Sequence, residues 1–256
     1  MNLRSALVLG TPLTATTYDE LTSALQQLAK QPRTVAVDFS NTHIVTLRRH
    51  DPSFRELTSE FDFFIPDGMP LIWCLNWRGM KLRDRVYGPT FMRHCVLKSA
   101  APFTHYFLGG SQDCLGRLQT FFLNQNPALK IIGVHHGYFK PDEEQQIVDE
   151  INRRSPDFIW VGLGTPKQQA WIHKYKTQIK RGIILAVGFA FDVNSGMKSD
   201  APLWMQRIGL TWVFRLGSEP RRLAVRYFKY NFLFLFYLLW DGLRGRASGP
   251  TGMTAE

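Results

Sequence analysis

The chain has 256 residues, of which 45% are hydrophobic, so it can bury a substantial core. Its net charge of +10 at pH 7 implies an anionic partner: nucleic acid, a membrane surface or a phosphate-bearing substrate. The three cysteines lie far apart and match neither a zinc spacing nor a redox pair, so reduced thiols in a cytoplasmic protein are expected. Residues 1–12 lack the charged-then-apolar pattern of an export signal, and none is expected.

Short apolar runs alternate with amphipathic stretches along residues 1–194. Strands are predicted at residues 6–9, 34–39, 61–66, 104–108, 130–134, 157–163 and 181–187. Helices are predicted at residues 18–30, 41–49, 69–77, 91–98, 112–124 and 141–154, and from about residue 166. This alternation predicts an α/β fold built on a doubly wound, mostly parallel, Rossmann-like sheet.

Two polar side chains directly follow predicted strands. Ligands of an open α/β sheet bind outside the carboxyl ends of its strands, where Asn41 and Asp67 are expected to lie. Each residue has two interpretations. Capping the following helix is the ordinary role of Asn and Asp, and the segment around Asp67 taken alone favours it. Alternatively, Asn41 points its amide into a crevice beside Asp67, and Asp67 is a catalytic base.

Three further turns have features of phosphate sites. Arg85 precedes the Gly88-Pro89 start of a predicted helix, and a helix N-terminus with a nearby Arg suits phosphate. Gly109-Gly110-Ser111 joins a strand to a helix, although a glycine pair is a weak signal of a nucleotide turn. The start signal Gly164-Thr165-Pro166-Lys167, in which Thr165 is a potential cap, places Gln168 in a first helical turn near the strand ends.

The composition changes after Asn194, where arginines alternate with aromatic residues. The apolar run at 232–240 is shorter than the ~20 residues that span a bilayer, and a basic, aromatic helix suits the membrane interface. Alternatively, the run packs on the core or on another subunit of a homo-oligomer. No nucleic-acid partner is expected, because no binding motif accompanies the basic residues. Residues 195–256 are predicted to form a helical appendage to a 1–194 core, with a disordered tail from Arg246.

Several segments, in order along nearly the whole chain, resemble those of the WecG/TagA/CpsF glycosyltransferase family. Their occurrence in register makes the resemblance specific, whereas one segment alone would not. The segments are Pro66-Asp67-Gly68-Met69, Arg85-Val86-Tyr87-Gly88, Phe107-Leu108-Gly109-Gly110, His135-His136-Gly137-Tyr138-Phe139, Gly162-Leu163-Gly164-Thr165-Pro166-Lys167-Gln168-Gln169-Ala170-Trp171 and Glu219-Pro220-Arg221-Arg222-Leu223.

The resemblance implies an inverting transferase that moves a hexose or N-acetylhexosamine from a UDP-sugar to a polyprenyl-diphosphate-linked sugar. It places the enzyme peripherally at the cytoplasmic face of the inner membrane, on an anionic surface. It implies that Asp67 is the catalytic base and that Asn41, Arg85 and Gln168 are further catalytic residues. It also implies that arginines near Arg221 close over the nucleotide. Together with the turns described above, the residues predicted to bind substrate are Gly109, Gly110, Ser111, Gly164, Thr165, Lys167, Arg215, Arg221 and Arg222.

The chemistry of the side chains fits such a transfer independently of the family resemblance. An ionised Asp accepts a proton from a hydroxyl, and a departing diphosphate needs positive charge. The sequence contains no Asp-x-Asp motif, so arginines and helix N-termini are expected to supply that charge, with no metal and no cofactor. Two segments depart from the family pattern, Phe39 and Gly88-Pro89-Thr90, and both glucosyl and N-acetylmannosaminyl transfer remain open. An alternative is a peripheral membrane or nucleic-acid-binding protein with a non-catalytic α/β scaffold.

Overall fold

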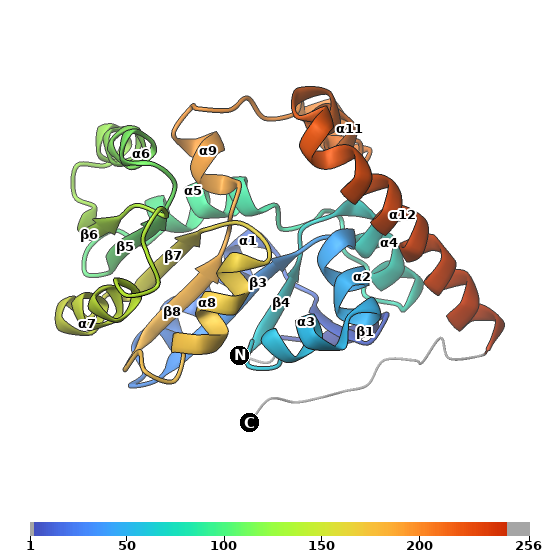
Figure 1. Cartoon of the computed structure of the whole chain (residues 1–256), viewed down its shortest axis with the longest axis horizontal. Coiled ribbons are helices and arrows are strands. Elements are labelled where there is room, and N and C mark those ends of the chain that lie inside the picture. The colour runs from blue at the N-terminus through green and yellow to red at the C-terminus, as the bar shows by residue number, and fades with distance from the viewer. Residues whose placement is uncertain (1–2, 245–256) are drawn as a thin grey trace.

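The structure, a computed structural model, describes residues 3–244, so the predicted disordered tail from Arg246 lies outside the described residues. Eight strands form one sheet in the order β1-β2-β4-β3-β8-β7-β5-β6 (Figure 1). The strands are β1 (Ser5–Val8), β2 (Thr11–Thr14), β3 (Thr34–Ser40), β4 (Phe63–Pro66), β5 (Thr104–Gly109), β6 (Lys130–His135), β7 (Phe158–Gly162) and β8 (Gly182–Ala186). All neighbouring pairs are parallel except β1 with β2, which confirms the predicted α/β sheet.

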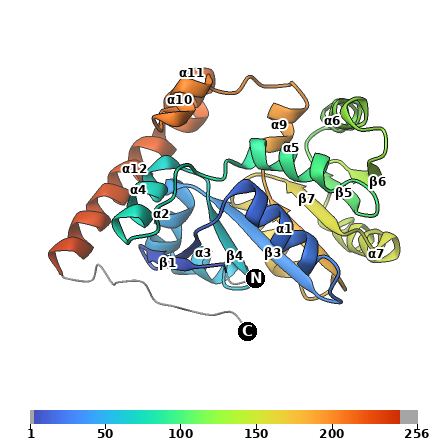
Figure 2. The same cartoon turned by 180° about the vertical axis from the view of Figure 1, so that it is seen from behind.

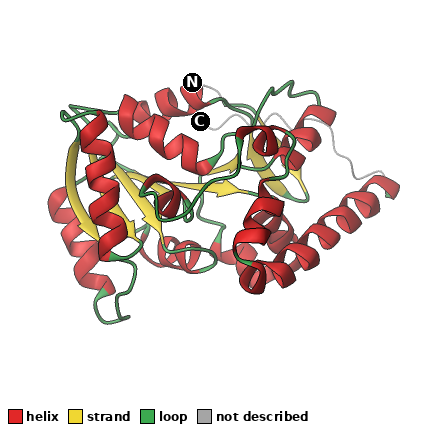
Figure 3. Ribbon diagram, turned by 90° about the horizontal axis from the view of Figure 1, so that it is seen from above, coloured by secondary structure: helices red, strands yellow, loops and turns green. Residues whose placement is uncertain are grey.

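Helices cover both faces of the sheet (Figures 1, 2 and 3). One face carries α2 (Thr42–His50), α3 (Pro52–Leu57), α4 (Met69–Trp77), α7 (Glu144–Arg154) and α8 (Lys167–Tyr175). The other face carries α1 (Tyr18–Leu28), α5 (Gly88–Lys98), α6 (Gln112–Gln125) and α9 (Ala190–Asn194).

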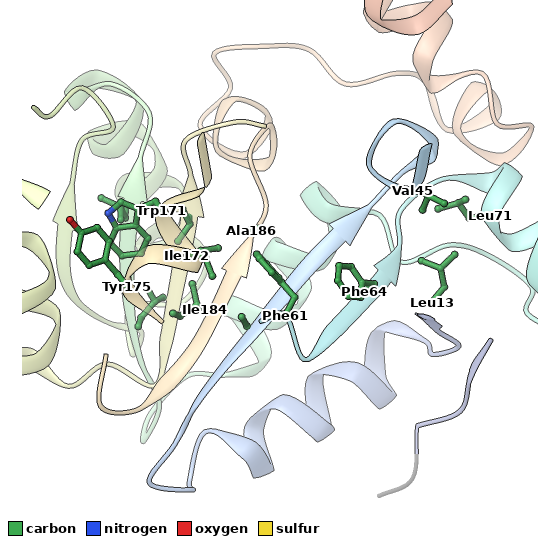
Figure 4. Close-up of a cluster of buried hydrophobic side chains, with 14 of the residues drawn as sticks. Leu13, Val45, Phe61, Phe64, Leu71, Trp171, Ile172, Tyr175, Ile184 and Ala186 are labelled. Carbon is green, nitrogen blue, oxygen red and sulfur yellow. The ribbon is translucent and has the colours of Figure 1, made fainter. Parts of the chain in front are cut away.

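The core is divided by the sheet into two apolar layers. Along the central strand β3, Ala36 belongs to one layer, whereas Val35, Val37 and Phe39 belong to the other. This alternation follows from the two-residue period of a strand, and burial on both faces explains its nearly continuous apolar sequence. Figure 4 shows part of the first layer, in which Leu71 of α4 lies near Leu13 of β2.

The structure corrects several predicted elements. The first strand forms an antiparallel hairpin with β2, which was not predicted, through a turn at Leu9 and Gly10, both with positive φ. The short helix α3 was not predicted either. The helix expected from residue 141 begins at Glu144. The N-cap of α8 is Pro166, and no side chain caps this helix, so the capping role predicted for Thr165 is wrong.

The chain after Asn194 forms α10 (Leu203–Arg207), α11 (Thr211–Ser218) and the long α12 (Pro220–Leu243). Figure 1 shows α12 running beside α2, and polar contacts join the two helices. Thr42 donates a hydrogen bond to Asn231 at 3.1 Å, and Arg49 pairs with Asp241 at 3.1 Å. Within residues 3–244, no helix combines the length and the hydropathy needed to cross a bilayer.

Candidate active site

Asn41 and Asp67 lie side by side because they follow the paired strands β3 and β4. The backbone N–H of Asp67 donates to the carbonyl of Ser40 at 2.8 Å. Asn41 caps α2, since its Oδ1 accepts from the backbone N–H of Ile44 at 3.2 Å, and it also lines the crevice. Both interpretations of Asn41 therefore agree with its position.

Asp67 does not cap the helix that follows it, so that prediction is wrong. Gly68 is the N-cap of α4 and makes no side-chain cap, and the extended Gly68 separates Asp67 from the helix. The Asp67 carboxylate instead accepts from the backbone N–H of Gly88, the first residue of α5, at 3.0 Å. A helix N-terminus favours the charged carboxylate.

Burial opposes this stabilisation of the charge on Asp67. Burial raises the pKa of the Asp67 carboxyl to about 7, although the Arg85 charge and the Gly88 N–H favour the ionised form. A carboxylate with a pKa near ambient pH is a stronger base than an ordinary Asp and is still ionised in a large share of molecules. Asp67 therefore has the properties of a general base at neutral pH.

Arg85 joins the Asp67 turn to the appendage. Its Nη1 donates to the backbone carbonyl of Asp67 at 3.2 Å, and its Nη2 donates to Oγ1 of Thr211 at 2.9 Å. The guanidinium carbon of Arg85 also lies 4.3 Å from the centroid of the Tyr87 ring. The Tyr87 hydroxyl donates to Asp200 at 2.7 Å. In this arrangement Arg85 holds the position of the Asp67 turn.

A cavity of about 500 Å³, here called the polar cavity, opens at the carboxyl ends of the strands. Its volume is within the range of small-molecule sites. Of the predicted residues, Asn41, Asp67, Gly110, Ser111, Gly164, Thr165, Lys167, Gln168, Arg215 and Arg222 line it. Gly110 and Gly164 have positive φ, at 65° and 76°, so glycine permits these turns.

Three predicted residues do not line the polar cavity. Gly109 lies below it, where a Cβ would come within 2.5 Å of the carbonyl carbon of Gly162, so this glycine lets β5 and β7 approach closely. Arg221 is exposed on α12, and Arg85 lines a neighbouring cavity instead. Gln168 does line the polar cavity, but its Oε1 also accepts from the backbone N–H of Gly164 at 3.2 Å.

The rim of the polar cavity is cationic, and most of its cations have carboxylate or aromatic neighbours. Lys198 pairs with Asp192 at 2.8 Å and with Glu219 at 2.7 Å. Glu219 also pairs with Arg222. The guanidinium carbon of Arg215 lies 3.9 Å from the ring centroid of Phe189. These contacts orient positive charge around a space that suits a diphosphate.

A second cavity of about 640 Å³, here called the apolar cavity, lies on the other side of Asp67. Asn41, Asp67 and Arg215 line both cavities. The remaining wall of the apolar cavity is largely aromatic and aliphatic, and it is built mainly by α4 and α12. A carboxylate thus stands where a polar, cationic space meets an apolar one.

The sequence profile of the Glycosyl transferase WecG/TagA/CpsF family matches residues 6–248. The chain belongs to this family. Among curated proteins it is similar to "N-acetylglucosaminyldiphosphoundecaprenol N-acetyl-beta-D-mannosaminyltransferase" of Bacillus spizizenii, with 27% identity over 79% of this chain and 80% of the relative. The protein of the same name from Bacillus subtilis is also 27% identical over 79% and 80%. That of Staphylococcus aureus (strain MRSA252) is 25% identical over 72% of each chain.

In this WecG/TagA/CpsF glycosyltransferase, Phe39 and Asp67 both lie near Gly88. Phe39, one of its departures from the family pattern, lines the polar cavity, and its ring lies 5.0 Å from that of Phe91. Gly88 donates its N–H to Asp67. A Cβ built on Gly88 would lie 3.8 Å from Cβ of Phe39 and 3.9 Å from Oδ2 of Asp67, so Phe39 lies close to this turn.

Sequence reasoning missed several lining residues of this glycosyltransferase. Lys198, Asp192 and Arg226 line the polar cavity, and Thr211 lines the apolar one. Arg226 follows Arg222 by four residues, a spacing that places both on one helix face and would have indicated it. Thr211 has no such signal, because its contact with Arg85 joins residues 126 positions apart.

Proposed function

We propose that this glycosyltransferase is an inverting enzyme that moves a hexose or N-acetylhexosamine from a UDP-sugar to a polyprenyl-diphosphate-linked sugar. The observation that carries the proposal is the position of Asp67 between a cationic polar cavity and an apolar cavity. The names of the relatives, which describe sugar transfer to N-acetylglucosaminyldiphosphoundecaprenol, support this assignment.

The donor is assigned to the polar cavity. The UDP diphosphate would contact cations supplied by Lys167, Arg215, Arg222 and Arg226, all of which line this space. As the bond between the sugar and the diphosphate breaks, negative charge grows on the departing oxygen, and fixed cations stabilise it. Lys198 can exchange its carboxylate partners for the diphosphate, because Asp192 and Glu219 hold it at the rim.

The acceptor is assigned to the apolar cavity, with its sugar at Asp67. The carboxylate removes the proton of the acceptor hydroxyl while that oxygen attacks the anomeric carbon from the face opposite the UDP. One C–O bond forms, the bond to UDP breaks, and the configuration inverts. The hydrogen bond from Gly88 and the contact of Arg85 with the Asp67 backbone hold the base in place.

The acceptor's lipid chain implies that the enzyme works at a membrane, and we assign it to the cytoplasmic face of the plasma membrane as a peripheral protein. Arg207, Arg221 and Lys229 are exposed basic residues of the appendage, and Leu203 and Phe232 are exposed apolar ones. Such a combination suits an anionic lipid surface.

The decisive experiment incubates the protein with a panel of UDP-sugars and lipid-linked sugar acceptors and measures product mass. We expect one UDP-hexose or UDP-N-acetylhexosamine to add a single sugar to an acceptor. UDP alone should raise the melting temperature. At a hundredfold excess over its Kd, UDP binding should add ~2.7 kcal/mol to the free energy of unfolding. A protein that binds neither UDP nor any donor would contradict the proposal and favour a non-catalytic scaffold.

The variant Asp67→Asn tests the base within this assay. It keeps an oxygen that can accept from Gly88 but removes the proton acceptor, so turnover should fall ~10²-fold or more. UDP binding should change little, because the polar cavity keeps its cations. Unchanged turnover would show that Asp67 is not the base.

A further inference from the structure

The apolar cavity is built from two helices that both begin beside the active site. On α4, Met69, Trp73 and Trp77 recur every four residues and line the cavity. On α12, the lining residues are Tyr227, Asn231, Phe234, Leu235 and Leu238, which share one face of the helix.

These two helix faces leave large apolar side chains accessible. Trp73 is 55% exposed, Trp77 is 89% exposed, and Leu235 is 60% exposed. A contiguous accessible apolar surface of this kind marks a binding site more often than an isolated exposed residue does. Because it surrounds a cavity of about 640 Å³, its concave shape suits a narrow apolar ligand better than a flat protein surface.

The cavity changes in polarity along its length. Asp67, Asn41 and Arg85 line it where α4 begins, and Trp77 ends α4. A helix rises ~1.5 Å per residue, so Trp77 lies ~12 Å farther along than Met69. The helix α12 changes in the same sense, since Arg226 lines the polar cavity and Leu238 lines the apolar one.

We infer that the apolar cavity holds the first isoprene units of the acceptor's lipid chain, with the sugar at Asp67 and the diphosphate between them near Arg85 and Arg215. This inference rests on the proposed function and adds a binding site to it. A ligand that fills the cavity must be polar at one end and apolar along the rest. A sugar, a diphosphate and a prenyl chain follow this order, whereas a bilayer acyl chain has no group to place at Asp67.

Two soluble acceptors test the inference: an acceptor-sugar diphosphate esterified with a short prenyl chain and the same compound as a methyl ester. Both are used without vesicles and below any micelle-forming concentration. We expect kcat/KM to be at least about tenfold higher for the prenyl compound, because its chain leaves water for the cavity. Equal values would overturn the inference and leave the proposed function intact, whereas no transfer to either compound would contradict the proposed function.

The chain offers a matched pair of variants. Leu235 lines the cavity, whereas Leu239, one turn later on α12 and 69% exposed, does not. Leu235→Asn should lower the prenyl-to-methyl ratio of kcat/KM about fivefold, and Leu239→Asn should leave it within about twofold. This ratio does not depend on the fraction of folded enzyme.

A second pair tests the other wall with the same ratio. Trp73→Ala should lower it, while Trp204→Ala, at an exposed tryptophan outside the cavity, should not. Equal effects of the lining and the control variants would assign the chain preference to general surface hydrophobicity and overturn the inference. A preference that appears only once micelles or vesicles are added would overturn it as well, in favour of bilayer contact.

Discussion

Two opposing effects set the pKa of Asp67: burial raises it, and the positive groups around the carboxyl lower it. Because burial raises the pKa of this carboxyl to about 7, the base is protonated and inactive in acid and becomes ionised as the pH rises through neutrality. We therefore expect kcat/KM to rise tenfold per pH unit below about 7 and to level off above it. The measurement is a pH profile at low donor concentration, which reports the free enzyme.

The control for this profile is the stability of the protein over the same pH range. Folding raises the pKa of the Asp67 carboxyl, so ionisation of this group destabilises the folded state. On account of Asp67 alone, the free energy of unfolding should fall as the pH rises from about 4 to about 7. Unfolding on account of Asp67 alone therefore cannot mimic the expected loss of activity. Burial lowers the pKa of His43 to about 3 and that of His105 to about 4, so these two groups destabilise the fold as the pH falls below about 6.5, and the stability curve separates their effect from the titration of Asp67. An acid limb near pH 4 would show that Asp67 titrates like an ordinary Asp.

Phe39 provides a test of donor choice. Its side chain occupies part of the wall of the polar cavity close to Gly88. Phe39→Thr should make room beside the sugar and raise kcat/KM for N-acetylated donors relative to unsubstituted hexose donors. Phe39→Leu keeps more of the apolar volume and should shift this ratio less. An unchanged ratio in both variants would remove Phe39 from the sugar site.

At the scale of elements, the start of α11 is tied to the Asp67 turn through one hydroxyl. Thr211→Val keeps the shape of this buried side chain but leaves an Nη2 N–H of Arg85 without its partner. We expect a loss of ~1–3 kcal/mol in unfolding free energy and a lower kcat, because the turn that holds the base is loosened. Thr211→Ser restores the hydroxyl and should recover both. Valine and serine variants with the same activity would mean that this contact does not position Asp67.

Positive charge at the polar cavity comes from side chains of three helices. Lys167 begins α8, Arg222 and Arg226 lie in the first two turns of α12, and Arg215 is in α11. With this supply, we expect activity to stay within about twofold when EDTA is present. The assay compares metal-stripped buffer, EDTA, and EDTA with excess Mg²⁺ or Mn²⁺. Activity that disappears with EDTA and returns with the metal would contradict metal-independent transfer.

Local sequence patterns predicted the elements that carry the site but not the contacts between them. Asn41 and Asp67 could be placed together because carboxyl ends of parallel strands meet at one edge of a sheet. The partner of Asp67, the N–H of Gly88, depends on how α5 packs, and no spacing in the sequence encodes it. The strand β2 was missed because it contains Pro12 and only four residues, and α3 because six residues give too little periodicity.

The long helix α12 gives the whole molecule two contrasting surfaces. Phe234 is buried against the core, and Tyr237 and Leu238 pack on it, so part of the predicted alternative, packing of the aromatic run on the core, is confirmed. Phe232, Phe236 and Leu239 remain exposed on the same helix. The apolar run therefore contributes both to the core and to a surface that a membrane can cover.

Membrane docking of the appendage is tested by vesicle sedimentation of the full chain. Each Lys or Arg near an anionic surface contributes ~1 kcal/mol, so a few exposed residues such as Arg221 and Lys229 suffice for reversible binding. The protein should pellet with anionic vesicles at low salt, be released as salt screens the charges, and bind neutral vesicles less well.

Leu239→Asn separates docking from acceptor binding, because Leu239 is exposed but does not line the apolar cavity. This variant should pellet less with vesicles while keeping the chain-length preference measured on soluble acceptors. If the unmodified protein stays in the supernatant with anionic vesicles at low salt, the exposed face of α12 does not dock on lipid. Sedimentation equilibrium of the same sample then tests the alternative, in which a second subunit covers this face and gives a homodimer mass.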